Sequence, residues 1–208
     1  INDEWNRYTT TFVASSTTTG SMRIISSGSN INLYAWGAQL EVGSYATSYI
    51  PTSGSTVTRN QDIFTRDGIG SLINSTEGVL FVEMAAFAND ESYRYIGLSD
   101  GNDDNRVVIL YYLNNNRIRA VVSSGGSNVF DDYYTVSSLS DFHNIAIKWK
   151  ANDFSLWVDG FERATLSSGA APIGLDRLVL DKGNGDDNFF GKVKQLQVYD
   201  TSLSDTQL

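Results

Sequence analysis

The sequence predicts an all-β fold, a two-sheet antiparallel β-sandwich or jelly roll with a small N-terminal β-strand region. Two observations carry this prediction. Apolar and aromatic residues recur in short runs at regular spacing, separated by turns rich in Ser, Thr, Asn, Asp and Gly. No long amphipathic helix interrupts these runs, and a chain of many short strands buries its apolar faces by stacking two sheets.

The region from about residue 70 to residue 208 contains most of these runs. Its strand-like segments are residues 78–84, 95–98, 106–113, 117–122, 144–150, 154–158, 161–166, 177–180 and 190–199. Asn114–Asn116 and Ala151–Asp153 have the composition of hairpin turns, because Asn and Asp tolerate the backbone angles that tight turns need. Successive strands joined in this way predict antiparallel pairing.

The last strand-like segment departs from strict alternation. Val193, Leu196 and Val198 share one face only if an extra residue is inserted near Lys194–Gln195. This spacing predicts a β-bulge. A helix is the competing interpretation, but the segment is short and contains β-branched residues.

The first 50 residues form a smaller region of three or four strand-like runs, which include residues 7–13, 22–25 and 34–42. So few strands make a weak independent fold. We therefore expect them to lean on the second region, on upstream sequence or on another chain. The expected organisation is an incomplete jelly-roll-like region, a linker and a sandwich, at residues 1–52, 53–69 and 70–208.

The composition excludes several classes of partner. The formal net charge of −9 repels phosphate backbones and anionic lipid surfaces, so we expect no nucleic-acid partner. No apolar run approaches the roughly 18 residues of a membrane span, so we expect no membrane insertion. The chain has no cysteine, which excludes disulfides and cysteine-based zinc sites. It begins with Ile1 and shows no signal peptide, so we expect a fragment of a longer protein.

Segments of the second region resemble one family of β-sandwiches. They are the opening Gly78–Glu83, the segment Phe154–Gly160, and the closing Phe190–Tyr199 with Leu203–Ser204. Their pattern is similar to that of the laminin-G-like, concanavalin A-type lectin/glucanase superfamily. The resemblance implies a concanavalin A-like jelly roll over most of the chain.

A second string lies in the N-terminal region. Trp36–Gly43, Ala46–Thr52, Thr58, Arg59 and Asp62 resemble the C-terminal end of carbohydrate-binding-module-like jelly rolls. Such elements are found in phage tail and tail-fibre proteins and in some secreted bacterial proteins that handle polysaccharides. The resemblance implies a location in the virion tail or outside the cell. Because viral tail fibres are commonly trimers, it also implies a homo-oligomer, a trimer.

We expect no enzymatic activity. Glycoside hydrolysis needs paired carboxylates roughly 5–10 Å apart, and the strand motif Glu-x-Asp-x-x-Glu of the superfamily's glucanases does not occur in the sequence. Glu83 is the only acid in its strand, and Glu41 stands alone in its own. The single histidine, His143, enters an apolar strand, where we expect a structural role. One histidine gives no support to a Ser-His-Asp triad.

Glycan sites combine an aromatic platform with planar polar side chains, because sugars present apolar faces rimmed by hydroxyls. Trp157 is the best platform, since its strand neighbours are expected to point inward and its own ring outward. By the same logic Glu83, Tyr112, Arg119 and Lys148 are expected on a solvated sheet face. We predict that these residues line a shallow sugar groove. The alternative is that Trp157 covers a contact between domains or subunits.

Calcium is the one cofactor that the sequence suggests. One polar turn holds Asp100, Asp103 and Asp104, and another holds Asp186 and Asp187. Oxygen-rich turns of this kind bind Ca²⁺. Neither follows the EF-hand spacing, and acidic residues are also ordinary turn formers, so a structural turn is the alternative to a metal site.

Taken together, these observations predict a non-catalytic carbohydrate-binding module of a phage tail or tail-fibre protein. Its expected partner is a host cell-surface glycan. Two alternatives stay open. One is an accessory glycan-binding module of a secreted bacterial polysaccharide-degrading enzyme, and the other is a purely structural module that spaces or trimerises a fibre.

Overall fold

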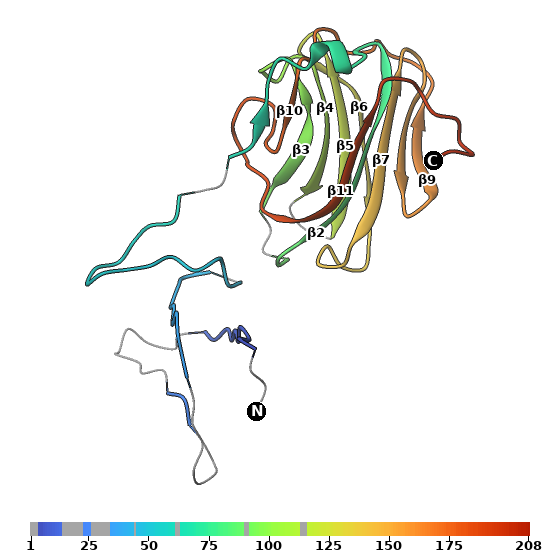
Figure 1. The fold of residues 1–208 in the computed structure, drawn as a ribbon. Coiled ribbons are helices and arrows are strands. Elements are labelled where there is room, and N and C mark those ends of the chain that lie inside the picture. The colour runs from blue at the N-terminus through green and yellow to red at the C-terminus, as the bar shows by residue number, and fades with distance from the viewer. Residues whose placement is uncertain are drawn as a thin grey trace. The chain divides into compact units, whose positions relative to one another are not determined.

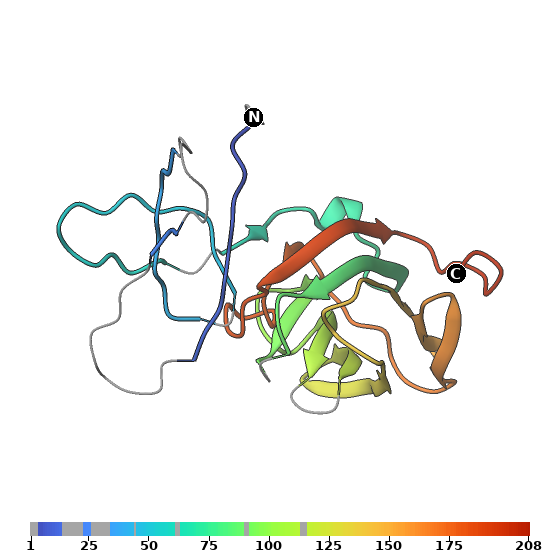
Figure 2. The same ribbon diagram turned by 90° about the horizontal axis from the view of Figure 1, so that it is seen from below.

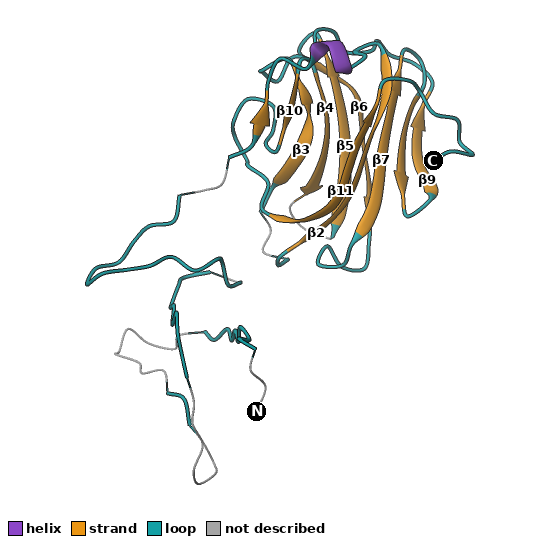
Figure 3. Cartoon of the chain, viewed as in Figure 1, coloured by secondary structure: helices purple, strands orange, loops and turns teal. Residues whose placement is uncertain are grey.

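The computed structural model describes residues 4–13, 23–25, 34–43, 45–60, 63–89, 92–112 and 116–208. The chain divides into two compact units, residues 1–60 and residues 61–208. Every strand of the described residues belongs to the second unit, as the orange segments of Figure 3 show.

The second unit consists of two antiparallel sheets (Figures 1 and 2). Its elements are β1 (Thr65–Arg66), the 3-10 helix η1 (Gly70–Leu72), β2 (Glu77–Ala86), β3 (Arg94–Ser99), β4 (Arg106–Tyr112), β5 (Arg117–Ser124), β6 (Ser127–Thr135), β7 (His143–Lys150), β8 (Phe154–Val158), β9 (Phe161–Leu166), β10 (Arg177–Val179) and β11 (Gly191–Tyr199). The six-stranded sheet A has the strand order β1-β10-β3-β4-β5-β6, and the five-stranded sheet B has the order β11-β2-β7-β8-β9. The predicted all-β sandwich is confirmed. Over the described ranges, no helix has the length and apolar character that crossing a membrane requires.

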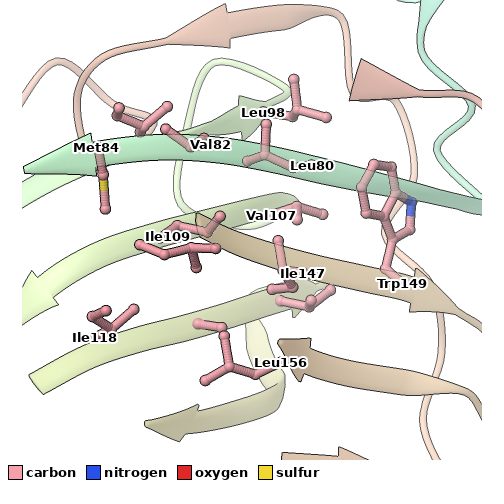
Figure 4. Close-up of a cluster of buried hydrophobic side chains, with 14 of the residues drawn as sticks. Leu80, Val82, Met84, Leu98, Val107, Ile109, Ile118, Ile147, Trp149 and Leu156 are labelled. Atoms are coloured by element: carbon pink, nitrogen blue, oxygen red, sulfur yellow. The ribbon is translucent and has the colours of Figure 1, made fainter. Parts of the chain in front are cut away.

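One hydrophobic core lies between the two sheets. Alternate residues of each strand point into it, among them Leu80 and Met84 of β2 and Val107 of β4 (Figure 4). Trp149 is fully buried at one end, and its indole Nε1 donates a hydrogen bond of 3.3 Å to the carbonyl of Asn74. The remaining residues of each strand therefore form the two outer faces of the sandwich.

The β-bulge that the last strand predicted is confirmed. The pairing of β11 with β2 shifts register between Val193 and Gln195. The shift places Leu196 and Val198 toward the core, where both pack against it. As a result, Gln195 and the residues in phase with it occupy the outer face of sheet B.

The turns follow the predicted chemistry where they are described. Asn116 and Asn152 adopt positive φ angles of 51° and 62°, a conformation that Asn accepts more readily than most residues. Leu113, Asn114 and Asn115, which the sequence placed in the same strand and turn, lie outside the described residues.

Strand β6 was not predicted from the sequence. It forms the edge of sheet A, and of its residues only Phe130 is buried. Asp131 and Asp132 stand in its middle and break the apolar pattern. An edge strand with one polar face gives little alternation to detect, so its existence depends on its pairing with β5.

The prediction of strands in the first unit is wrong for the residues that the structure describes. Residues 7–13, 23–25 and 34–42 form no strand. A strand needs a hydrogen-bonded partner, and large side chains of this unit such as Trp36 and Leu40 are 75% and 82% exposed. Met22, which was part of an expected strand, lies outside the described residues.

The polar residues of the N-terminal string bond to one another instead. The Glu41 carboxylate accepts hydrogen bonds of 2.6 Å from both the backbone N–H and the hydroxyl of Thr47, and these lower the pKa of Glu41. Arg59 donates to the Ser48 carbonyl at 2.6 Å and to its hydroxyl at 2.7 Å. Asp62 of the same string lies outside the described residues. The string thus fixes its own local conformation.

Candidate functional site

The residues predicted to share one sugar groove lie on two different faces. Glu83 of β2, Lys148 of β7 and Trp157 of β8 are on the outer face of sheet B, because their strand neighbours belong to the core. Tyr112 of β4 and Arg119 of β5 are on the outer face of sheet A. The prediction of a single groove is therefore wrong, because the core separates the two groups.

Trp157 points outward, as alternation predicted, but it is covered. Its side chain is only 9% exposed and forms a small apolar cluster with Val79, against which Leu203 and Leu208 pack. The indole Nε1 donates to the Ser155 hydroxyl at 2.9 Å. The ring therefore covers a contact with the chain's own last residues and offers no open platform.

The two charged residues on this face are already paired. Lys148 is 3.0 Å from the carboxylate of Asp153 and 3.4 Å from that of Asp205. Glu83 lies 2.8 Å from Lys194 of β11. These ion pairs satisfy the charges that the sequence assigned to sugar binding.

The outer face of sheet A has a different composition. In one row across the sheet, Tyr95 lies opposite Leu110, which lies opposite Arg119, and Arg119 lies opposite Tyr133. In the next row, Tyr112 lies opposite Arg117. We call the polar and aromatic side chains that gather here the tyrosine–arginine face: Tyr93, Tyr95, Tyr112, Arg117, Arg119, Asp131 and Tyr133.

Three of the four tyrosines of this face lie together. The rings of Tyr93 and Tyr112 are 5.4 Å apart in an edge-on arrangement, and those of Tyr93 and Tyr95 are 6.0 Å apart. They pack against the buried outward side chains of Val108 and Leu110. The apolar residues beneath fix the rings, so their free surfaces are preorganised for contact with another molecule.

Arg119 is held in place by Asp131. Its Nε and Nη2 donate to the two carboxylate oxygens, each at 2.6 Å, and this pairing raises the pKa of Arg119. Asn128 donates to the same carboxylate at 3.0 Å. The guanidinium also lies 5.1 Å above the ring of Tyr112. Arg119 therefore presents a rigid planar group beside an aromatic ring.

Arg117 is the unpaired cation of the face. Its guanidinium stacks 4.1 Å above the ring of Tyr133, and its Nε is buried without a hydrogen-bond partner. Across the described residues, the Arg117 guanidinium makes no hydrogen bond or ion pair. A partly buried guanidinium with unused donors is costly unless something accepts them, so this group is the one most suited to a ligand.

Burial, with a smaller contribution from the Asp187 carboxylate, raises the pKa of Tyr95 to about 12 from its ordinary value of 10.0. A raised folded-state pKa contributes stability that is fully present below pH 10 and is lost as the pH rises through 12. Tyr95→Phe lacks this ionisation, so we expect its alkaline unfolding, followed by circular dichroism, to shift to higher pH than in the original chain. The exposed Tyr199→Phe is the control. An unchanged midpoint in Tyr95→Phe contradicts this expectation.

The acidic turns proposed for calcium lie beside one another. Asp103 pairs with Arg106 at 2.8 Å and with Lys182 at 3.1 Å. The Asp100 carboxylate accepts from the backbone of Asn102 and the side chain of Asn105 at 3.1 and 2.9 Å. The turns are therefore held by protein groups.

The structure does not bring the acidic side chains of these turns into a metal-binding cluster. Asp186 accepts a 3.1 Å hydrogen bond from Asn184, and Asp187, with a positive φ of 50°, lies close enough to Tyr95 to affect its pKa. No three His, Cys, Asp or Glu side chains within the described ranges, Asp104 included, are arranged to hold a metal ion. Calcium binding stays a prediction from the sequence.

His143 has the arrangement of a structural residue. Its Nδ1 is 2.8 Å from the Asp159 carboxylate, and its Nε2 is 3.0 Å from the Ser138 carbonyl. The ring is only 8% exposed. Both nitrogens are thus occupied by the protein, in agreement with the structural role expected from the sequence.

The sequence analysis missed most of the tyrosine–arginine face. Tyr93 and Tyr95 are two residues apart, a spacing that places both on one side of a strand, and this signal was available. Asp131 and Tyr133 belong to the undetected strand β6. The sequence contains no signal for Arg117, because the lack of a hydrogen-bond partner for its guanidinium is visible only in the structure.

Comparison with known proteins adds the following. Residues 80–208 match the family model of the concanavalin A-like lectin/glucanases superfamily. No curated protein sequence matches the chain. The chain is similar to the CBM40 of Ruminococcus gnavus IT-sialidase, with 17% identity, a TM-score of 0.55, and coverage of 66% of this chain and 83% of that one. A structure of the same CBM40 bound to α2,3-sialyllactose matches at 18% identity, with the same coverage and TM-score.

The chain is also similar to the leech intramolecular trans-sialidase complexed with 2,7-anhydro-Neu5Ac. The identity is 20% and the TM-score is 0.56, with coverage of 70% of this chain but only 25% of the leech protein. Likeness at these identities concerns the fold alone.

Proposed function

This chain belongs to the concanavalin A-like lectin/glucanases superfamily, and from that premise we propose that it is a non-catalytic carbohydrate-binding module. The observation that carries the proposal is the unpaired Arg117 guanidinium, set among tyrosine rings on the outer face of sheet A. Sugar rings stack on aromatic faces, and their hydroxyls and carboxylates accept hydrogen bonds from planar donors. The CBM40 bound to α2,3-sialyllactose, which has the same fold, supports this proposal.

The non-catalytic part of the proposal rests on chemistry. Glycoside hydrolysis uses two carboxylates in defined positions, one of which exchanges a proton. Glu83, the acid of β2, is engaged with Lys194 at 2.8 Å. Asp131, the acid of the tyrosine–arginine face, is saturated by Arg119 and Asn128. The two acids also lie on the outer faces of different sheets, so they do not form the pair that this chemistry needs.

For the biological setting, we propose a phage tail or tail-fibre protein that attaches the particle to host surface polysaccharide. The location is then the virion tail or the extracellular space. The support is the N-terminal string Trp36–Gly43 and Ala46–Thr52, which resembles elements of such proteins. Its polar residues form hydrogen bonds with each other. These bonds hold the string in one local conformation, which suits an element that occurs as a unit in such proteins.

We further propose that the protein is a homotrimer. The first unit exposes many large apolar side chains, including Tyr8 at 90% and Trp36 at 75%. Exposed apolar surface of this kind favours contact with other chains. We expect solution mass measurements to give three times the 22.9 kDa of the chain. A strictly monomeric species contradicts the trimer.

An accessory module of a secreted polysaccharide-degrading enzyme is the second candidate. We propose it because a module of similar fold belongs to an enzyme, the Ruminococcus gnavus IT-sialidase. Both candidates share the same binding chemistry and differ only in the protein that carries the module.

A glycan array tests the shared proposal. We expect the chain to bind a related set of oligosaccharides and to release none of them as hydrolysed product. Binding to no glycan on an array that includes bacterial surface polysaccharides would contradict the proposal and favour a purely structural fibre module.

A further inference from the structure

A hollow lies on the outer face of sheet B, away from the tyrosine–arginine face. Its volume is about 160 Å³, and residues of β2, β11 and the C-terminal turn line it. We call it the glutamine pocket, after Gln195, Gln197 and Gln207. Tyr199, Phe81 and Leu203 complete its main walls.

Two neighbouring strands build the floor of this pocket. Gln197 lies opposite Phe81 and Gln195 lies opposite Glu83 in the pairing of β11 with β2. The bulge between Val193 and Gln195 sets this register and turns both glutamines outward. The floor therefore alternates amide groups with an aromatic ring.

The C-terminal turn, which includes Leu203 and Gln207, forms one side of the pocket. The backbone N–H of Gln207 donates to the Ser204 carbonyl at 2.8 Å, and Gln207 Oε1 accepts from the Ser204 N–H and hydroxyl at 3.0 and 2.8 Å. Leu203 packs against the Trp157 cluster, and Asp205 lies 3.4 Å from Lys148. The turn is thus fixed against sheet B from two sides.

Hydrogen bonds within the protein orient two of the glutamine amides through their oxygens and leave the NH₂ groups unbonded. Gln197 Oε1 accepts a hydrogen bond from the Tyr199 hydroxyl, and Gln207 Oε1 is bound to Ser204. Over the described ranges, the NH₂ groups of Gln195, Gln197 and Gln207 have no hydrogen-bond partner. Three NH₂ groups, each with two N–H donors, therefore remain available around the ring of Phe81.

The side chains that line the pocket carry no charge, although the chain as a whole has a net charge of −9. Amide donors beside an apolar ring suit a ligand with hydroxyl acceptors and an apolar face. An ionised ligand would find no side chain of opposite charge in the lining. The small volume limits the occupant to one sugar ring.

We propose that the glutamine pocket binds a single neutral sugar residue. This site is separate from the tyrosine–arginine face, because the two lie on opposite sheets. Its occupation does not depend on glycan binding at Arg117. The chain then holds two sugar sites, and a branched or repeating polysaccharide engages both with an avidity above that of either site.

Side-chain amide NMR tests this proposal directly. The chain has only five glutamines, so their NH₂ resonances can be assigned with single variants. Each probe is added separately to the full chain: D-galactose, D-glucose, N-acetyl-D-glucosamine and, as the charged comparison, N-acetylneuraminic acid. We expect saturable shifts of the Gln197 and Gln207 amides with at least one neutral sugar and none with the acid.

The variant Gln195→Leu removes the one glutamine amide of the pocket whose side chain makes no hydrogen bond within the described residues. We expect about tenfold weaker binding of the active sugar, seen in the Gln197 amide, with an unchanged melting temperature. Arg117→Ala is the independence control and should leave the affinity of this pocket unchanged. The proposal is overturned if no neutral sugar shifts these amides, if the acid shifts them more strongly, or if Arg117→Ala abolishes the shifts.

Discussion

Arg117→Ala is expected to weaken binding of an array-selected oligosaccharide by about 10- to 100-fold. In the free protein the Arg117 guanidinium has no hydrogen-bond partner among the described residues and stacks 4.1 Å above Tyr133. Its donors are therefore free for the ligand, and hydrogen bonds to a charged group are worth about 1.5–3 kcal/mol each. Isothermal titration calorimetry with the same oligosaccharide measures the change.

Lys194→Ala is the matched control for this variant. It also removes one positive charge, but from the outer face of sheet B, where Lys194 pairs with Glu83 at 2.8 Å. We expect its affinity to stay within about twofold of the original, since a surface pair contributes little. Equal losses in both variants would mean that overall charge, rather than the tyrosine–arginine face, drives binding.

Gly97→Ala is expected to destabilise the fold by about 3 kcal/mol. Gly97 lies in β3 opposite Val108 of β4, and a Cβ atom there would lie 2.4 Å from Val108 Cγ1 and 2.5 Å from the Val107 carbonyl oxygen. The carbonyl belongs to the backbone and cannot rotate away, so the strands must separate. Urea unfolding gives the free energy.

Gly70→Ala is the comparison for this substitution. A Cβ at Gly70 would meet its nearest neighbours at 3.5 Å, an ordinary van der Waals distance. We expect a change within about 0.5 kcal/mol there. If Gly97→Ala unfolds at the same urea concentration as the original chain, the close packing of β3 against β4 is wrong.

The sandwich was predictable because its inward residues alternate in most strands. Val193, Leu196 and Val198 even revealed the bulge, since burial forces the register to absorb one extra residue. Strand β6 was not predicted, because Phe130 is the only buried residue of this polar edge strand. The opposite error occurred in the N-terminal runs, where strands were predicted but do not form. Their residues favour strands, but the described residues provide no strand for them to pair with.

The proposed binding face was less predictable than the fold. Alternation placed Trp157 on an outer face correctly, but Leu203 and Leu208, far along the chain, cover it. Tyr112 and Arg119 were selected and lie together, whereas Arg117 was not. Whether an outward side chain is covered, paired or free depends on long-range contacts that residue order does not encode locally.

The central claim is that oligosaccharide binds to the outer face of sheet A. A crystal structure of the chain with an array-selected oligosaccharide tests it most directly. The account predicts a sugar ring stacked on Tyr112 or Tyr133, with an oxygen of the glycan within hydrogen-bond distance of the Arg117 guanidinium. A glycan bound only elsewhere, with Arg117 left untouched, would contradict it.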